Sequence, residues 1–128
     1  MNKMTNKIKF NLEFVVKSSP SLLFNYISSP SGLEQWFSDN VKSRGEQFIF
    51  IWENSEEHAT LISKKNNHSV KFKWDEAEDD TFFELRIQID DLTQDVALIV
   101  TDFADEDELD EAKLLWETQL SNLHAIIG

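Results

Sequence analysis

Apolar and polar residues alternate near the start of the chain, and this pattern predicts a β-strand. In residues 8–16 every second side chain is apolar, with lysine, asparagine and glutamate at three of the four positions between. A period of two is typical of a strand with one buried face. Two short helices are expected next. The first begins with Ser19 as its cap and Pro20 at its first helical position, and the second covers residues 32–37. The apolar side of the first helix would consist of Leu23, Phe24 and Ile27.

Residues 41–103 contain repeated strand patterns, separated by turn signals about every ten residues. Such spacing is typical of an antiparallel meander. Each strand pattern has one polar face, which favours a sheet that is covered on one side only. The expected strands are 41–44, 47–53, 57–64, 69–74, 81–90 and 95–103. The clearest alternation is in residues 81–90, where the inward-pointing side chains would be Phe83, Leu85, Ile87 and Ile89.

The last element is the longest predicted helix, over residues 107–127. Asp105 or Asp107 could cap it, and further carboxylates stand in its first turn, where the helix dipole favours negative charge. Its inner stripe would comprise Leu109, Ala112, Leu115, Trp116, Gln119, Leu120, Leu123 and Ile127.

The order of these elements predicts an α+β fold. A helix of this length cannot lie flat on a twisted sheet unless the sheet curls around it. We therefore expect a curved antiparallel sheet, in the order β-α-α followed by five or six strands, wrapped around a long C-terminal helix. Neither a linker nor an internal repeat interrupts the pattern, so a single domain is expected over residues 1–128, with an ordered core of about 7–127.

Composition narrows the classes of protein. The chain of 128 residues has no cysteine, which excludes disulfides, thiolate zinc sites and iron–sulfur clusters. It contains ten Phe, four Trp and one Tyr, too many aromatic residues for a disordered chain even at a net charge of −12. The longest apolar runs, 48–52 and 96–100, have five residues each, so no membrane span is expected. With no apolar targeting segment after residue 9, we expect a cytoplasmic protein.

The negative charge is concentrated in the second half of the chain. Residues 1–74 hold ten basic and seven acidic side chains, whereas residues 75–128 hold two basic and seventeen acidic ones. Such a surface repels phosphate backbones, which makes nucleic acid a poor partner. The acidic stretch is either a solvated face or a surface that attracts a basic region of a partner protein. The residues of this candidate partner surface are Asp102, Asp105, Glu106, Asp107, Glu108 and Asp110.

A set of positions along the chain can be compared with known families: Pro20, Leu23, Phe24, Ile27, Pro30, Leu33, Trp36, Phe37, the run 70–74, the strand pair 81–103, Trp116, Leu120 and Leu123. On these residues the pattern resembles the START-like (SRPBCC, birch-pollen-allergen-like) superfamily, and within it the branch of the activator of the ninety-kilodalton heat-shock protein ATPase. The resemblance covers about residues 7–127 and implies the helix-grip fold. In such relatives the space between the curled sheet and the last helix is a cavity for an apolar ligand.

No motif for catalysis, a cofactor or a metal is present in the sequence. His58, His68 and His124 lack metal-ligand spacing, and the chain has too few glycines for a phosphate loop. The acidic residues around 102–110 do not have the register of a calcium loop, and helix capping explains them. A cyclase- or hydratase-like enzyme, as found among START-like relatives, would need a buried titratable group with a perturbed pKa facing the cavity.

The aromatic residues are the remaining candidates for function. They exceed what a core of this size needs, so they either line a cavity for a small apolar ligand or fill it. The candidate lining residues are Phe37, Phe50, Trp52, Leu61, Phe72, Leu85, Trp116 and Leu120. The leading hypothesis is a non-enzymatic domain that binds an apolar small molecule. The alternatives are a chaperone-activator-like interaction module that uses the acidic surface and, third, an enzyme.

Overall fold

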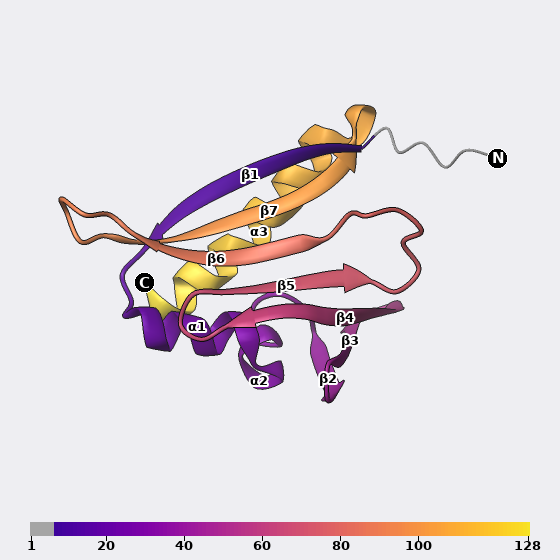
Figure 1. Ribbon diagram of the computed structural model, residues 1–128, viewed down its shortest axis with the longest axis horizontal. Helices are drawn as coiled ribbons and strands as arrows, with labels where there is room; N and C mark the ends of the chain where they lie inside the picture. Colours follow the sequence, from indigo (N-terminus) through magenta and orange to yellow (C-terminus); the bar gives the residue numbers. More distant parts are fainter. Residues whose placement is uncertain (1–6) are drawn as a thin grey trace.

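The computed structural model describes residues 7–128 as one curved sheet with three α-helices (Figure 1). All neighbouring strands are antiparallel. In chain order the elements are β1 (Lys7–Val16), α1 (Pro20–Ser28), α2 (Pro30–Leu33), β2 (Asn40–Arg44), β3 (Gln47–Trp52), β4 (Ser55–Lys65), β5 (Ser69–Trp74), β6 (Phe83–Ile89), β7 (Val96–Asp105), a short 3-10 turn η1 (Glu106–Glu108) and α3 (Leu109–Ile127).

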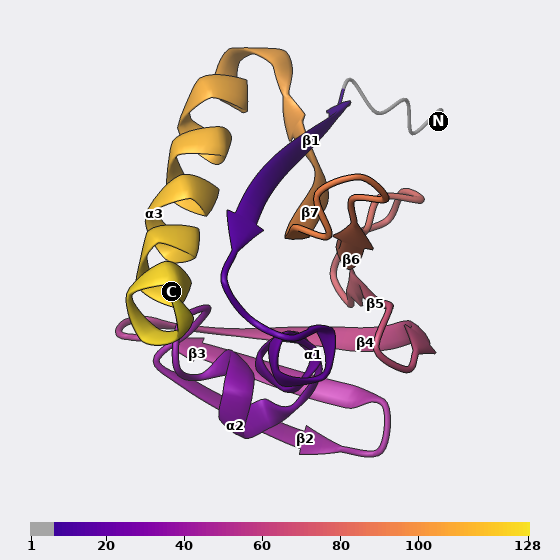
Figure 2. The ribbon, with the colours of Figure 1, turned by 90° about the vertical axis from the view of Figure 1, so that its left-hand side faces the viewer.

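The strand order across the sheet is β1-β7-β6-β5-β4-β3-β2. The meander β2 to β7 runs in sequence order, and β1 joins it beside the last strand, with Lys7 opposite Asp105 and Val16 opposite Val96. Figure 2 shows that the sheet bends between the β1 side and the β2 side and that α3 runs along its concave side. The predicted fold, a curved antiparallel sheet around a long C-terminal helix, is confirmed.

The start of α1 is as predicted. Ser19 accepts a hydrogen bond from the Leu22 amide on its side-chain oxygen (3.2 Å), and Pro20 is the first helical residue. The prediction of the second helix over 32–37 is wrong. This helix begins at Pro30, because the side chain of Ser29 caps it by accepting from the Gly32 amide (3.0 Å). It ends at Leu33, and residues 34–37 form turns instead.

Strand β6 is shorter than expected. It starts at Phe83, because the amide of Thr81 bonds to the side chain of Asp79 (3.1 Å) within the preceding loop. Phe83, Leu85 and Ile87 are buried as predicted, whereas Ile89 is 46% exposed. Ile89 is the last residue of the strand and pairs with Val96, the first residue of β7, next to the loop between the two strands.

The helix α3 differs from the prediction at its start and along one side. Neither Asp105 nor Asp107 caps it with a side chain, because the chain enters the helix through η1. Its buried residues are Trp116, Leu120 and Leu123. Leu115 was expected on the inner stripe but is 61% exposed, because the stripe that meets the sheet is narrower than the sequence suggested. No helix within residues 7–128 is long and apolar enough to cross a membrane; a cytoplasmic location stays a prediction.

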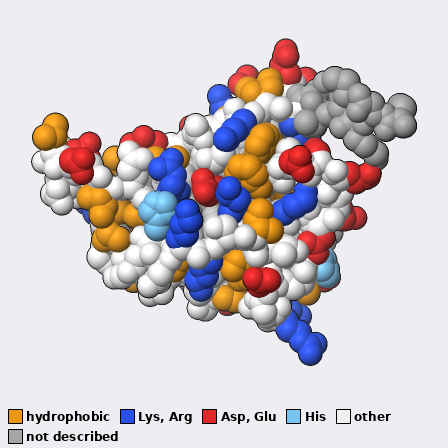
Figure 3. Space-filling model, in the orientation of Figure 1, with side chains coloured by type: hydrophobic (Ala, Val, Ile, Leu, Met, Phe, Trp, Pro, Cys, Tyr) orange, Lys and Arg blue, Asp and Glu red, His pale blue; other side chains and the backbone are white. Residues whose placement is uncertain are grey.

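The face of the sheet away from α3 carries basic side chains over aromatic rings. The Lys71 ammonium lies 4.3 Å from the centre of the Phe82 ring, and Phe82 meets Phe103 edge to face. Figure 3 shows Lys and Arg next to hydrophobic side chains on this face. The outer side of the meander is therefore polar and carries both basic and acidic side chains.

Candidate functional site

Phe37 lies at the centre of an aromatic cluster between the sheet and α3. Its ring is 5.5 Å from the Trp52 ring of β3, 5.5 Å from the Phe83 ring of β6 and 5.4 Å from the Trp116 ring of α3, measured between ring centres. Phe37 itself is in the turn after α2, and it is buried. One side chain from an irregular segment thus joins two strands and the terminal helix.

Further rings extend the cluster across the sheet. Phe50, Phe72 and Phe83 are completely buried, and the Phe72 and Phe83 rings stack at 5.1 Å. Of the candidate lining residues, the structure brings Phe37, Phe50, Trp52, Phe72 and Trp116 into this cluster of touching rings. Leu85 and Leu120 are buried in the same core, and Leu61 is half-buried beside it.

Phe83 and Trp74 also belong to the cluster but were missing from the candidate list. The alternation in residues 81–90 already pointed Phe83 inward, so the sequence contained the signal. Trp74 is the last residue of β5, and its ring lies 5.2 Å from that of Phe83.

The polar groups at the edge of the cluster are paired within the protein. The backbone carbonyl of Phe37 accepts two hydrogen bonds, from Trp52 Nε1 (3.1 Å) and from Gln119 Nε2 (2.8 Å). A buried tryptophan needs a partner for its N–H, and here the turn after α2 supplies it. The Phe37 carbonyl therefore connects the turn after α2 to both β3 and α3 through hydrogen bonds.

A groove of about 410 Å³ opens beside this cluster, between the turn after α2, the end of β3 and the middle of α3. We call it the Trp52 groove. It is lined by residues 34–39, by Trp52, and by Leu115, Gln119 and Asn122 of α3. The exposed Leu115 that departs from the predicted stripe therefore forms part of its wall. Two of the candidate lining residues, Phe37 and Trp52, line this groove.

Asp102 lies apart from the rest of the acidic stretch. It faces α3 from β7, where Oδ2 accepts a hydrogen bond from Trp116 Nε1 (2.8 Å) and Oδ1 accepts one from the Phe103 amide (2.7 Å). Burial raises the pKa of this carboxyl above its ordinary value, and the hydrogen bonds from Trp116 and Phe103 oppose that shift only in part. Both oxygens are engaged by the protein, so Asp102 acts here as the partner of the Trp116 indole.

The raised pKa of Asp102 gives a pH-dependent prediction. A carboxyl whose pKa is higher in the folded state costs no stability below its unfolded pKa, near 3.8, and lowers stability as the pH rises through the folded value. Asp102→Asn removes this effect. We therefore compare the free energies of unfolding of the two proteins at each pH. As the pH rises above about 4, the parent protein should lose stability relative to Asp102→Asn, and the difference should then level off. Urea unfolding of both proteins across this range measures it.

Asp110→Asn is the matched control for this experiment, because it removes an exposed carboxylate from the start of α3. Subtracting the pH dependence of unfolding measured for Asp110→Asn from that measured for Asp102→Asn corrects for the change in net charge. A difference between the parent and Asp102→Asn that stays constant with pH would contradict the assignment.

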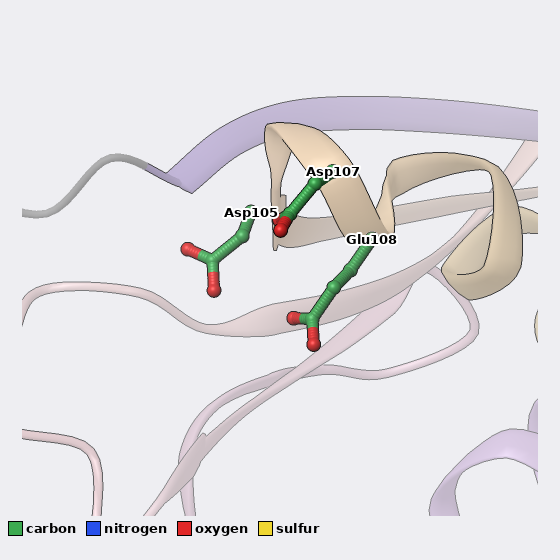
Figure 4. Close-up of side chains that lie close together, drawn as sticks. All are labelled: Asp105, Asp107 and Glu108. Atoms are coloured by element: carbon green, nitrogen blue, oxygen red, sulfur yellow. The ribbon is translucent and has the colours of Figure 1, made fainter.

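The other acidic candidates gather where β7 passes into α3. Oxygens of Asp105, Asp107 and Glu108 lie within 4.8 Å of one another, and Figure 4 shows these three side chains close together. Glu106 and Asp110 are exposed next to them. Because no side chain caps η1 or α3, hydrogen bonds at the helix start do not use these carboxylates.

Comparison with known proteins identifies the family of this chain. A family model described as a START-like superfamily domain matches residues 4–128. No curated protein matches the chain. A solved structure of BfR322 from Bacteroides fragilis is 33% identical, with a TM-score of 0.66, over 94% of this chain and 90% of that one.

Two other solved structures share the fold at lower identity. The Aha1 dimer from Colwellia psychrerythraea has a TM-score of 0.79 at 13% identity, over 94% of this chain and 96% of that one. CalU16 from Micromonospora echinospora has a TM-score of 0.67 at 16% identity, over 94% of this chain and 73% of that one. The match over residues 4–128 confirms the resemblance read from the sequence: the chain belongs to the START-like superfamily.

Proposed function

We propose that this START-like domain binds a small, largely apolar molecule in the Trp52 groove and performs no chemistry on it. The observation that carries the proposal is a groove of about 410 Å³ with Trp52 and the exposed Leu115 in its wall. Sites for small molecules are typically concave, mainly apolar and about 300 Å³ or larger, with a few polar groups that orient the ligand. The Trp52 groove is more polar than this, because six of its ten lining residues are polar or charged; Gln119 and Asn122 are the polar residues that α3 contributes.

The packing of the interior favours the groove over the space beneath α3. The Phe83 ring touches the rings of Phe72 (5.1 Å), Phe37 (5.5 Å) and Trp116 (5.9 Å), so aromatic side chains fill this region. A ligand there would have to displace rings that are already in contact. In this proposal the buried rings of Phe37, Phe50 and Phe72, together with Leu85, support the site from within, and the ligand contacts Trp52 and Leu115.

The proposal predicts saturable binding that depends on Leu115. Titration with 4-phenylbutan-1-ol, followed by tryptophan fluorescence and by native mass spectrometry, should give a single-site curve. Leu115→Gln should raise the dissociation constant by about tenfold, since losing the contact of one leucine costs about 1.5 kcal/mol.

Leu114→Gln is the matched control, because Leu114 is 62% exposed on the same helix and does not line the groove. It should leave the dissociation constant unchanged. Absence of saturable binding, or an equal loss in both variants, would contradict the proposal.

A second candidate function is docking of a basic protein surface on the acidic cluster of Asp105, Asp107 and Glu108. It is supported by the closeness of these carboxylates just before α3 and by the exposure of Asp107 and Glu108; Asp105 is half-buried. The same residues also interact favourably with the dipole of α3, which explains their presence without a partner. We therefore rank this interaction module second. The third hypothesis, an enzyme, is less supported, because both oxygens of Asp102 already accept protein hydrogen bonds.

A further inference from the structure

The rim of the Trp52 groove is acidic. Glu34 and Asp39, both from the segment after α2, are its charged lining residues, and neither lysine nor arginine lines it within residues 7–128. The other polar groups of the lining are amides, a hydroxyl and two indoles. The charge at this site is therefore of one sign, although basic side chains are present on the outer face of the sheet.

From this charge we infer that the ligand of the Trp52 groove is an organic ammonium ion: a molecule with a cationic nitrogen and an apolar, aromatic or alkyl body. The inference rests on the proposed function and specifies its ligand class. The apolar body would lie against Trp52 and Leu115, and the cationic nitrogen would lie toward Glu34 and Asp39.

The two carboxylates differ in how they are held. Glu34 is half-buried, and its Oε1 accepts a hydrogen bond from the Val41 amide (3.1 Å), which fixes the group at the edge of β2. Asp39 is exposed, and within the described part of the chain it has no hydrogen-bond or ion-pair partner. Glu34 thus offers a positioned negative charge, and Asp39 offers one that is free to approach a ligand.

The aromatic lining favours the same class of ligand. The faces of indole and phenyl rings attract cations through their quadrupole, and tryptophan does so most strongly. The net charge of −12 also raises the local concentration of cations around the protein. A fatty acid would instead place its carboxylate beside Glu34 and Asp39, where like charges repel.

Three probes with one body and different heads test the inference: 4-phenylbutylamine, 4-phenylbutan-1-ol and 4-phenylbutanoate, titrated at pH 7 and low ionic strength with tryptophan fluorescence as the readout. The amine should bind about tenfold more tightly than the alcohol, and the carboxylate more weakly than the alcohol. The double variant Glu34→Gln/Asp39→Asn should bring the affinity for the amine close to that for the alcohol. The glutamine side chain introduced by Glu34→Gln keeps an oxygen that can accept from the Val41 amide, so the fold of this segment is retained.

Asp91→Asn is the control, because Asp91 is exposed in the loop between β6 and β7 and its substitution removes a charge far from the lining of the groove. It should leave the preference for the amine intact. Equal binding of amine and alcohol by the parent protein would overturn the ammonium assignment and leave the proposed function standing. A preference for the amine that survives the double variant would also overturn it, since general charge would then be the cause. If none of the three probes binds, both proposals fail.

Discussion

Phe37→Ala is expected to lower the free energy of unfolding by about 3–5 kcal/mol, the usual loss when a buried phenylalanine is truncated. Phe37 is 4% exposed, and its ring meets five others from its own turn, β3, β6 and α3, namely those of Trp36, Phe50, Trp52, Phe83 and Trp116. The cavity left by its removal cannot close by moving one neighbour alone. Chemical denaturation monitored by tryptophan fluorescence measures the loss, which is a large part of the roughly 5–15 kcal/mol typical of a domain.

Phe82→Ala serves as the control, because Phe82 is half-buried on the outer face of the sheet and its ring meets one other ring, that of Phe103. We expect a clearly smaller loss for this variant. Phe37→Leu keeps most of the buried volume and should lie between the parent and Phe37→Ala. Equal losses for Phe37→Ala and Phe82→Ala would show that the central position of Phe37 has no energetic importance.

Gly32→Ala is expected to destabilise the protein by about 3 kcal/mol, at the upper end of the usual cost of overpacking. A β-carbon at Gly32 would lie 2.1 Å from the carbonyl oxygen of Asn25 and 2.7 Å from the α-carbon of Tyr26. Both are backbone atoms of α1, so the helix itself would have to move. Ser31→Ala, at the exposed neighbouring position, should change stability little in the same denaturation experiment.

The Gly32→Ala variant also tests whether the shape of the Trp52 groove depends on the packing of α2 against α1. Residues 34–39 follow directly after α2, so a shift of α2 away from α1 would move one wall of the Trp52 groove. Gly32→Ala should therefore weaken binding of 4-phenylbutan-1-ol in addition to lowering stability. A variant that is destabilised by the expected amount but binds normally would show that the groove does not depend on the contact between α1 and α2.

The fold could be predicted from the sequence because each long element has its own regular pattern. The alternation in residues 81–90 indicated the inner face of β6, and Ser19 with Pro20 marked the start of α1. The groove could not be predicted in this way. The periodicity placed Leu115 in the buried stripe of the last helix, and only the rotation of α3 against the sheet leaves this side chain exposed in the wall of the groove.

The orientation of Asp102 could not be predicted from the sequence either. In sequence it stands just before the acidic run 105–110, and this closeness groups it with that surface. Its position in β7 directs it toward α3, where the Trp116 indole needs an acceptor. The predicted strand 95–103 already included Asp102, but its apolar run 96–100 does not alternate with polar residues, so the sequence did not show which face of the strand Asp102 occupies. The structure extends β7 to Asp105, two residues past the predicted end.

The pairing of β1 with β7 has a consequence for the synthesis of the protein. The side chains of Asn11 and Thr101 share a hydrogen bond although they are ninety residues apart in the chain. While the ribosome is still making the meander, β1 therefore has no strand beside it, and the apolar side of β1 stays without its final cover. Contacts between such distant residues slow the folding of a chain, and unpaired strands expose a nascent protein to aggregation. The last strand to emerge is thus the one that completes the sheet.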